Sequence, residues 1–172
     1  GAAYRFPFFR ELISPVISLM KAVPVASFVI LALIWISSKN LSIFISFLMV
    51  FPIMYENMLA GLESADAKLL EMGQVFHLSR MARIRAIYLP AAYPFLLSAA
   101  RLSLGMCWKS GIAAEVIGQP RQSIGAELNQ AKLFFNTPDL FAWTVTIIVV
   151  SVVFERLVLC GIRALMRRWE RA

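Results

Sequence analysis

Charged residues are scarce in this chain. Asp, Glu, Lys and Arg together make up 16% of its 172 residues, whereas hydrophobic residues make up 60%. Soluble globular domains are about 25% charged and about 45–50% apolar. The apolar excess is larger than a core of this size needs, and it excludes an ordinary soluble domain. The sequence therefore predicts a protein embedded in a lipid bilayer.

Cysteine and histidine are almost absent. Cys107 and Cys160 both lie in apolar stretches, and His77 is the single histidine. These residues cannot supply a disulfide framework or a metal site. An intramembrane protease would need a Ser–His pair, paired membrane aspartates or an H-E-x-x-H motif. Asp66 and Asp139 lie outside the apolar runs. We therefore expect no metal site and no enzymatic activity in this chain.

Two further sequence patterns are missing. There is no glycine-rich phosphate-binding loop, so any ATP would be bound, with Mg²⁺, and hydrolysed by a separate subunit. We therefore expect no cofactor in this chain. There is also no basic face interleaved with aromatic residues, although the net charge is +7. The basic residues instead sit in short segments between apolar runs, which favours a membrane protein and excludes nucleic acid as a partner.

Four apolar runs dominate what is present. They predict membrane-spanning helices near residues 12–37, 41–60, 90–114 and 139–162. The first run contains Pro15, Lys21 and Pro24, which predict a broken helix, with a kinked helix facing lipid as the alternative. No repeat, low-complexity tract or linker divides the chain. We therefore expect residues 1–172 to form one all-α integral membrane bundle of about four spans.

The distribution of basic residues predicts the orientation of these spans. With a cytoplasmic N-terminus, twelve Lys and Arg residues lie on the cytoplasmic side and only three on the outside. The twelve are Arg5, Arg10, Lys21, Lys68, Arg80, Arg83, Arg85, Arg156, Arg163, Arg167, Arg168 and Arg171, and the three are Lys39, Arg121 and Lys132. The positive-inside rule therefore predicts cytoplasmic termini, a cytoplasmic loop at 61–90 and an external loop at 115–138.

The 61–90 loop is longer than a minimal connector. Its pattern predicts two short amphipathic helices, the first from Asp66 to Phe76 and the second capped by Ser79. Pro90 stands where the next membrane helix begins, a position that proline favours. We interpret the loop as a helical hairpin that binds a cytoplasmic partner.

The loop also carries a spaced motif. It reads Glu71-Met72-Gly73, three residues, His77, nine residues, and Ile87-Tyr88-Leu89-Pro90. This spacing resembles the cytoplasmic loop of permease subunits of bacterial binding-protein-dependent ABC importers, which reads E-A-A, three residues, G, nine residues, I-x-L-P. Gly73 replaces the second alanine and His77 replaces the glycine. Segments from Ser14 to Arg168, among them Ala113-Ala114-Glu115-Val116-Ile117-Gly118, resemble the nitrate/sulfonate/taurine branch.

The resemblance implies a mechanism and partners. The loop would be a coupling helix that docks on an ATP-binding cassette ATPase through Glu71, Gly73, His77, Ile87, Leu89 and Pro90. Two ATPase copies, a second permease copy in a homodimer and an extracytoplasmic solute-binding protein would complete a transporter in the bacterial inner membrane. Its solute would be a small anion or organic nutrient. Members of the family usually have one or two more spans before the position that corresponds to Gly1. The resemblance therefore implies either an N-terminally truncated five- or six-span permease fold or a reduced permease.

Three charged residues fall in or beside the third span. Arg101 and Lys109 are eight residues apart, so they lie about 12 Å apart along a helix and on neighbouring faces. They are candidates for the path of an anionic solute, together with Glu115. The alternatives are an ion pair with another helix for Lys109, snorkelling for Arg101, and a helix-packing or gate contact for Glu115. A non-transporting membrane scaffold or channel subunit remains the alternative function.

Overall fold

The computed structural model describes the backbone of residues 2–170 and the side chains of residues 3–167. All elements in this part of the chain are helices, which confirms the predicted all-α class. Arg168 and Arg171, which belong to the basic cluster predicted near the C-terminus, lie outside the described side chains. The elements are α1 (Ala2–Arg5), α2 (Pro7–Ala22), α3 (Val25–Ala32), α4 (Ser38–Glu63), α5 (Ala67–Val75), α6 (Arg80–Arg83), the π-helix η1 (Ile84–Tyr88), α7 (Leu89–Gly118), α8 (Ile124–Leu133) and α9 (Thr137–Glu170).

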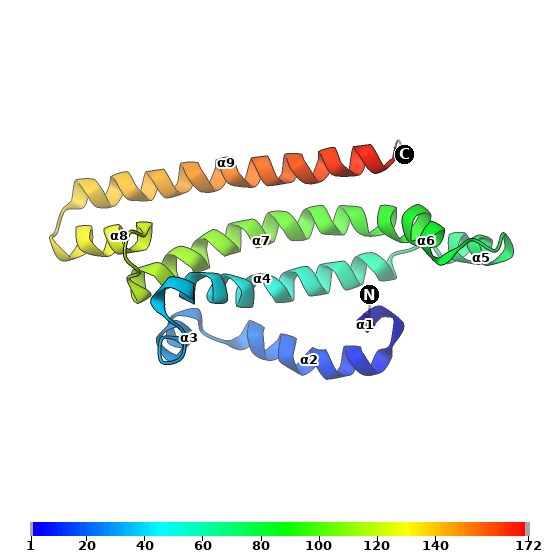
Figure 1. Cartoon of the computed structure of the whole chain (residues 1–172), viewed down its shortest axis with the longest axis horizontal. Coiled ribbons are helices and arrows are strands. Elements are labelled where there is room, and N and C mark those ends of the chain that lie inside the picture. The colour runs from blue at the N-terminus through cyan, green and yellow to red at the C-terminus, as the bar shows by residue number, and fades with distance from the viewer. Residues whose placement is uncertain (1, 171–172) are drawn as a thin grey trace.

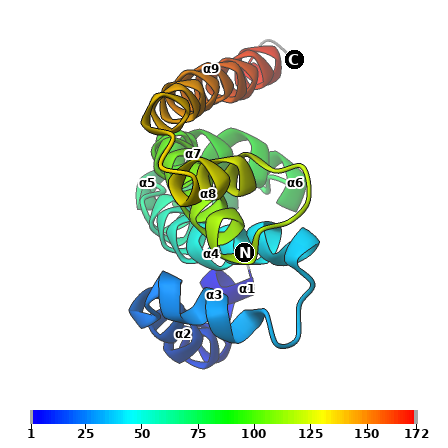
Figure 2. The ribbon, with the colours of Figure 1, turned by 90° about the vertical axis from the view of Figure 1, so that its left-hand side faces the viewer.

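The long helices run side by side in three layers (Figure 1). In the end-on view α9 forms one outer layer, α4 and α7 the middle, and α2 with α3 the other outer layer (Figure 2). α5 and α6 extend from one end of the bundle, whereas α3 and α8 lie at the other end (Figure 1). The fold therefore separates these two groups of short helices by the length of the bundle.

Three helical stretches are long and apolar enough to cross a membrane. They comprise 26 residues in α4, 39 residues from Arg80 to Gly118, and 31 residues from Thr137 to Arg167. Each exceeds the roughly 20 residues that a span needs. The pair α2 and α3 passes the same test only when taken together, because it bends by 101°. The described residues thus contain three candidate spans, or four if the bent pair is one span.

The bend between α2 and α3 follows from proline chemistry. Pro24 lacks the backbone N–H that would continue α2, and it biases Val23 toward extended geometry, with φ −68° and ψ 122°. The chain therefore leaves α2 at Val23 and starts α3 after Pro24. The break predicted near Pro24 is confirmed. Pro15, by contrast, is accommodated inside α2.

Small residues hold the middle layer together. α7 buries a row of Ala and Ser side chains, namely Ala92, Ala99, Ala100, Ser103, Ser110 and Ala114. Such residues let helix backbones approach closely inside a membrane. A Cβ atom added at Gly61 of α4 would lie 3.0 Å from the Cα atom of Ala92. Near the other end, Val29, Ala32, Leu41, Ile45 and Ala114 form the buried core cluster.

The outer layers leave apolar surface uncovered. Only 6% of the apolar window of α9 is buried inside the chain, compared with 28% of that on the 39-residue stretch. Ile148, Val149 and Leu157 of α9 are each more than half exposed. In water this surface would be costly, whereas lipid or a second subunit covers it without penalty. The exposure pattern therefore agrees with the composition.

Candidate functional site

The hairpin of residues 61–90 is built by two capped helices. The Asp66 carboxylate accepts a hydrogen bond from the backbone N–H of Lys68 at 2.9 Å and starts α5. The Ser79 hydroxyl accepts one from the backbone N–H of Ala82 at 3.2 Å and starts α6. Each cap satisfies a donor that a helix N-terminus leaves free. Both caps are the ones that the sequence predicts.

The turn between these helices depends on a left-handed residue. The N–H of Leu78 donates to the carbonyl of Gly73 at 2.9 Å, and the N–H of His77 donates to that of Gln74 at 3.0 Å. These two bonds form the Schellman motif that ends many helices. The motif places His77 at φ 49°, a region that glycine enters freely. Glycine, the residue of the motif that this loop resembles, would therefore adopt this conformation at lower cost than histidine does.

Replacing His77 with glycine is expected to stabilise the hairpin or leave it unchanged. A side chain in the left-handed region costs about 1–2 kcal/mol, which glycine avoids. Replacing His77 with valine is expected to destabilise the hairpin, because a β-branched residue tolerates this geometry worst. Limited proteolysis of the purified protein measures the difference, with cleavage in the hairpin slower for His77→Gly than for His77→Val. Equal cleavage rates in the two variants would contradict a left-handed residue 77.

The two halves of the spaced motif meet inside the hairpin. Gly73 is buried, and a Cβ atom added there would lie 3.4 Å from Cδ1 of Ile87 and 3.4 Å from Cδ1 of Leu78. Ile87 is itself only 6% exposed. Leu89 and Pro90 then occupy the first two positions of α7. Gly73 and Ile87 therefore fix α5 against η1, and the I-x-L-P segment joins the hairpin to the long helix.

Glu71 and His77 remain on the surface of the hairpin, and both are exposed. At 100° per residue, Glu71 lies on the side of α5 away from Gly73. The structure therefore brings together Gly73 and Ile87 from the predicted coupling residues, and leaves Glu71 and His77 facing outward.

An exposed apolar stripe follows α5 and was missed by the sequence analysis. Leu69, Met72, Val75 and Phe76 are 46%, 54%, 74% and 71% exposed. They lie within about 120° of the helix circumference, and Glu71 borders them on one edge. The three- to four-residue spacing was a detectable signal. The spacing could not show that this face of α5 stays exposed, because that depends on whether another part of the chain packs against it.

The base of the hairpin contacts the N-terminal helix. The rings of Tyr4 and Tyr88 meet edge to face, with centroids 5.6 Å apart. A hydrogen bond with Tyr88, burial, and the negative charge of Glu63 raise the pKa of Tyr4. Tyr4 therefore stays neutral and keeps its hydroxyl hydrogen-bonded at physiological pH.

The three charged candidates of the solute path occupy different places along α7. Arg101 lines a groove between α7 and α9. Lys109 lines a separate cavity of about 340 Å³, which it shares with Ser151 and Glu155 of α9. Glu115 lies near the end of α7, where its Oε2 accepts a hydrogen bond from the N–H of Gly125 at 3.1 Å. Arg101, Lys109 and Glu115 thus line three different hollows, and their part in a solute path stays a prediction.

Glu115 also lies at a close contact between α7 and α8. Gly125, at the start of α8, is buried against Glu115 and Val116. An added Cβ atom would come within 2.6 Å of the carbonyl carbon of Glu115 and of the backbone nitrogen of Val116. This contact and the hydrogen bond above hold α8 across the end of α7.

Comparison with known proteins supplies the family. Residues 1–171 match the family described as the binding-protein-dependent transport system inner membrane component. A probable ABC transporter permease protein of Brucella abortus is 28% identical over 95% of this chain and 65% of its own length. The taurine transport system permease protein of Escherichia coli is 29% identical over 94% of this chain and 58% of its own length. A putative aliphatic sulfonates transport permease protein of Bacillus subtilis is 30% identical over 81% and 50%.

The chain thus spans between half and about two thirds of the length of these relatives. The matching region covers almost the entire sequence, including the hairpin, α7 and α9. The expected resemblance to importer permeases is confirmed. The chain belongs to the family of inner membrane components of binding-protein-dependent transport systems.

Proposed function

We propose that this chain is a permease subunit of an ATP-driven importer, and that its hairpin docks on a separate ATP-binding cassette ATPase. The exposed apolar stripe on α5 carries this proposal. A contiguous apolar surface at the end of a capped and packed hairpin is typical of a protein–protein contact. Glu71 at its edge adds a carboxylate for a polar rim contact. ATP and Mg²⁺ are bound by the ATPase.

The direction of the chain in the membrane is part of the proposal. The hairpin and both termini lie on the cytoplasmic side, as the excess of basic residues there supports. α8 and the exposed Phe134 and Phe135 that follow it then lie on the external side, where an extracytoplasmic solute-binding protein delivers its cargo. A second copy of the permease and two ATPases complete the assembly. The names of the taurine and sulfonate relatives support a small anion or organic nutrient as the solute.

Co-purification with the ATPase encoded beside this chain tests the proposal. Wild type is expected to retain the ATPase on a tagged permease. Phe76→Asp is expected to reduce retention at least about tenfold, because it places a charge in the apolar contact. Glu71→Ala is expected to reduce it less, as rim charges contribute little to affinity. The matched control is Phe134→Asp, a phenylalanine at the other end of the bundle that is 80% exposed against 71% for Phe76, and it should retain the ATPase fully.

Retention that is unchanged in Phe76→Asp would remove the apolar stripe from the docking surface. Failure of wild type to retain any ATPase would favour a non-transporting scaffold or channel subunit instead.

A further inference from the structure

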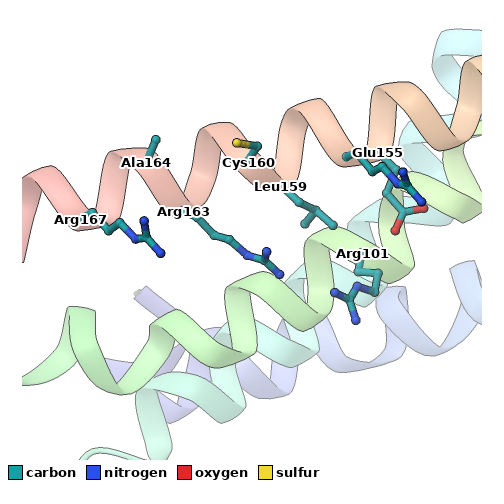
Figure 3. Close-up of a pocket in the computed structure, with 8 residues that line it drawn as sticks. Arg101, Glu155, Leu159, Cys160, Arg163, Ala164 and Arg167 are labelled. Carbon is teal, nitrogen blue, oxygen red and sulfur yellow. The ribbon is translucent and has the colours of Figure 1, made fainter.

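A basic groove runs between α7 and α9 (Figure 3). It has a volume of about 750 Å³ and is lined by Arg101 of α7 and by Arg156, Arg163 and Arg167 of α9, together with Glu155, Leu159, Cys160 and Ala164. Figure 3 shows Arg163 and Arg167 reaching from α9 toward α7. Four positive charges therefore meet one negative charge in a groove with an apolar floor.

The three arginines of α9 share one helix face. Arg163 and Arg167 follow Arg156 by seven and eleven residues, so all three lie within about 40° of each other. This face is the one turned toward α7 at the groove. The arginines therefore form a stripe along one wall of the groove.

Within residues 3–167, whose side chains the structure describes, the arginines of the groove form no ion pair. Among the residues whose side chains are described, the ion pairs join Arg10 to Glu63 and Lys21 to Glu56, both on the other side of the bundle. All four groove arginines are exposed. Glu155 also lines the cavity that contains Lys109. The groove therefore carries an uncompensated positive charge that an external anion can neutralise.

The position of the groove along the membrane normal indicates which kind of anion it binds. Arg156 lies 19 residues after Thr137, or about 28 Å along α9, and Arg101 lies about 26 Å along α7 from Gly118. The hydrocarbon core of a bilayer is about 30 Å thick. Measured from the ends of α7 and α9 near α8, these two arginines therefore lie at the far boundary of the core rather than deep within the predicted spans 90–114 and 139–162, and Arg163 and Arg167 lie beyond it. This is the level of the phospholipid headgroups.

We propose that the groove between α7 and α9 binds the phosphate headgroup of an anionic phospholipid from the cytoplasmic leaflet. Basic pockets between membrane helices on that side suit such headgroups. Arg163 and Arg167 bind the phosphate oxygens, for which the guanidinium fork is well matched. The uncharged surface of α9 from Leu140 to Phe154 lies beside the acyl chains. The leaflet assignment rests on the orientation in the proposed function, whereas headgroup binding itself does not require the ATPase.

Native mass spectrometry of the full chain, purified in detergent without the ATPase, tests this assignment. Wild type is expected to retain phosphatidylglycerol at least about tenfold better than phosphatidylcholine. The double variant Arg163→Gln/Arg167→Gln is expected to lose about 25-fold in phosphatidylglycerol affinity, since each arginine near the headgroup contributes about fivefold. Arg163→Lys/Arg167→Lys keeps the charge and should retain most of the binding. The matched control Arg121→Gln/Lys132→Gln removes the same charge near α8 and should bind as wild type does.

Several outcomes would overturn the assignment. Equal retention of the two lipids by wild type would show that the groove does not select an anionic headgroup. Equal losses of phosphatidylglycerol binding in the groove variant and in the matched control would show that only the net charge of the protein matters. Displacement of the lipid by millimolar inorganic phosphate or methanesulfonate, but not by chloride, would make the groove a site for a free anion. Loss of the ATPase with intact lipid binding would overturn the proposed function alone.

Discussion

Gly125→Ala is expected to destabilise the protein by about 2 kcal/mol or more, and to lower its melting temperature by about 5 °C. The added methyl group would lie within 2.6 Å of backbone atoms of Glu115 and Val116. Backbone atoms in a helix cannot swing aside as a flexible side chain can, so α8 must move away from α7. That movement would also break the hydrogen bond from the N–H of Gly125 to Glu115. Thermal unfolding in detergent, followed by tryptophan fluorescence, measures the change.

Gly105→Ala is the matched control for this prediction. Gly105 lies in the interior of α7, and a Cβ atom there would meet nothing within 4 Å. Alanine is a better helix former than glycine by up to about 1 kcal/mol, so this variant should be as stable as wild type or slightly more stable. A melting temperature for Gly125→Ala that matches that of Gly105→Ala would contradict the close contact of α8 with α7.

Gly73→Leu is expected to open the hairpin and to reduce ATPase retention at least about tenfold. A leucine side chain needs the space that Cδ1 of Ile87 and Cδ1 of Leu78 already fill. Since Gly73 contacts Ile87 between α5 and η1, the larger side chain must push aside the ends of the Ile87 and Leu78 side chains and so loosen this contact. Limited proteolysis at the hairpin reports this opening directly and does not depend on the ATPase. Co-purification then measures its effect on docking.

Gly73→Ala tests whether the effect of Gly73→Leu comes from the size of the new side chain or from the loss of glycine itself. A Cβ atom at 3.4 Å from its neighbours makes an ordinary van der Waals contact, so alanine fits without displacement. It is also the residue that the motif of related permeases carries at this position. We expect wild-type protease resistance and wild-type ATPase retention. Protease sensitivity in Gly73→Ala equal to that in Gly73→Leu would show that the hairpin packs differently.

Local features of the fold could be predicted from the sequence because they depend on neighbouring residues. Asp66 and Ser79 cap their helices because each side chain reaches a backbone N–H two or three residues further along the chain. The break before α3 follows from the missing N–H of Pro24. The composition alone indicated helices that face lipid. Each of these inferences needs only the chemistry of a few adjacent residues.

The pairing of helices could not be predicted, because it depends on contacts far apart in the sequence. Gly61 packs on Ala92, and Glu115 reaches Gly125, but glycine and alanine occur throughout apolar helices and give no distinctive pattern. The groove was missed for the same reason. The sequence relates Arg101 to Lys109 on the same helix, whereas in the structure Arg101 lines one groove together with arginines of α9. The roles predicted for Glu71 and His77 in coupling stay predictions.

The continuity of the helix from Arg80 to Gly118 has a mechanical consequence. In the π-helical turn the N–H of Leu89 donates to the carbonyl of Ile84, five residues earlier instead of four. The turn does not interrupt the helix. A helix of 39 residues is about 58 Å long. A tilt of about 5° about one end would move the other by about 5 Å. A small rotation imposed at the hairpin would therefore be amplified, by leverage alone, into a displacement of α8 at the opposite face of the membrane.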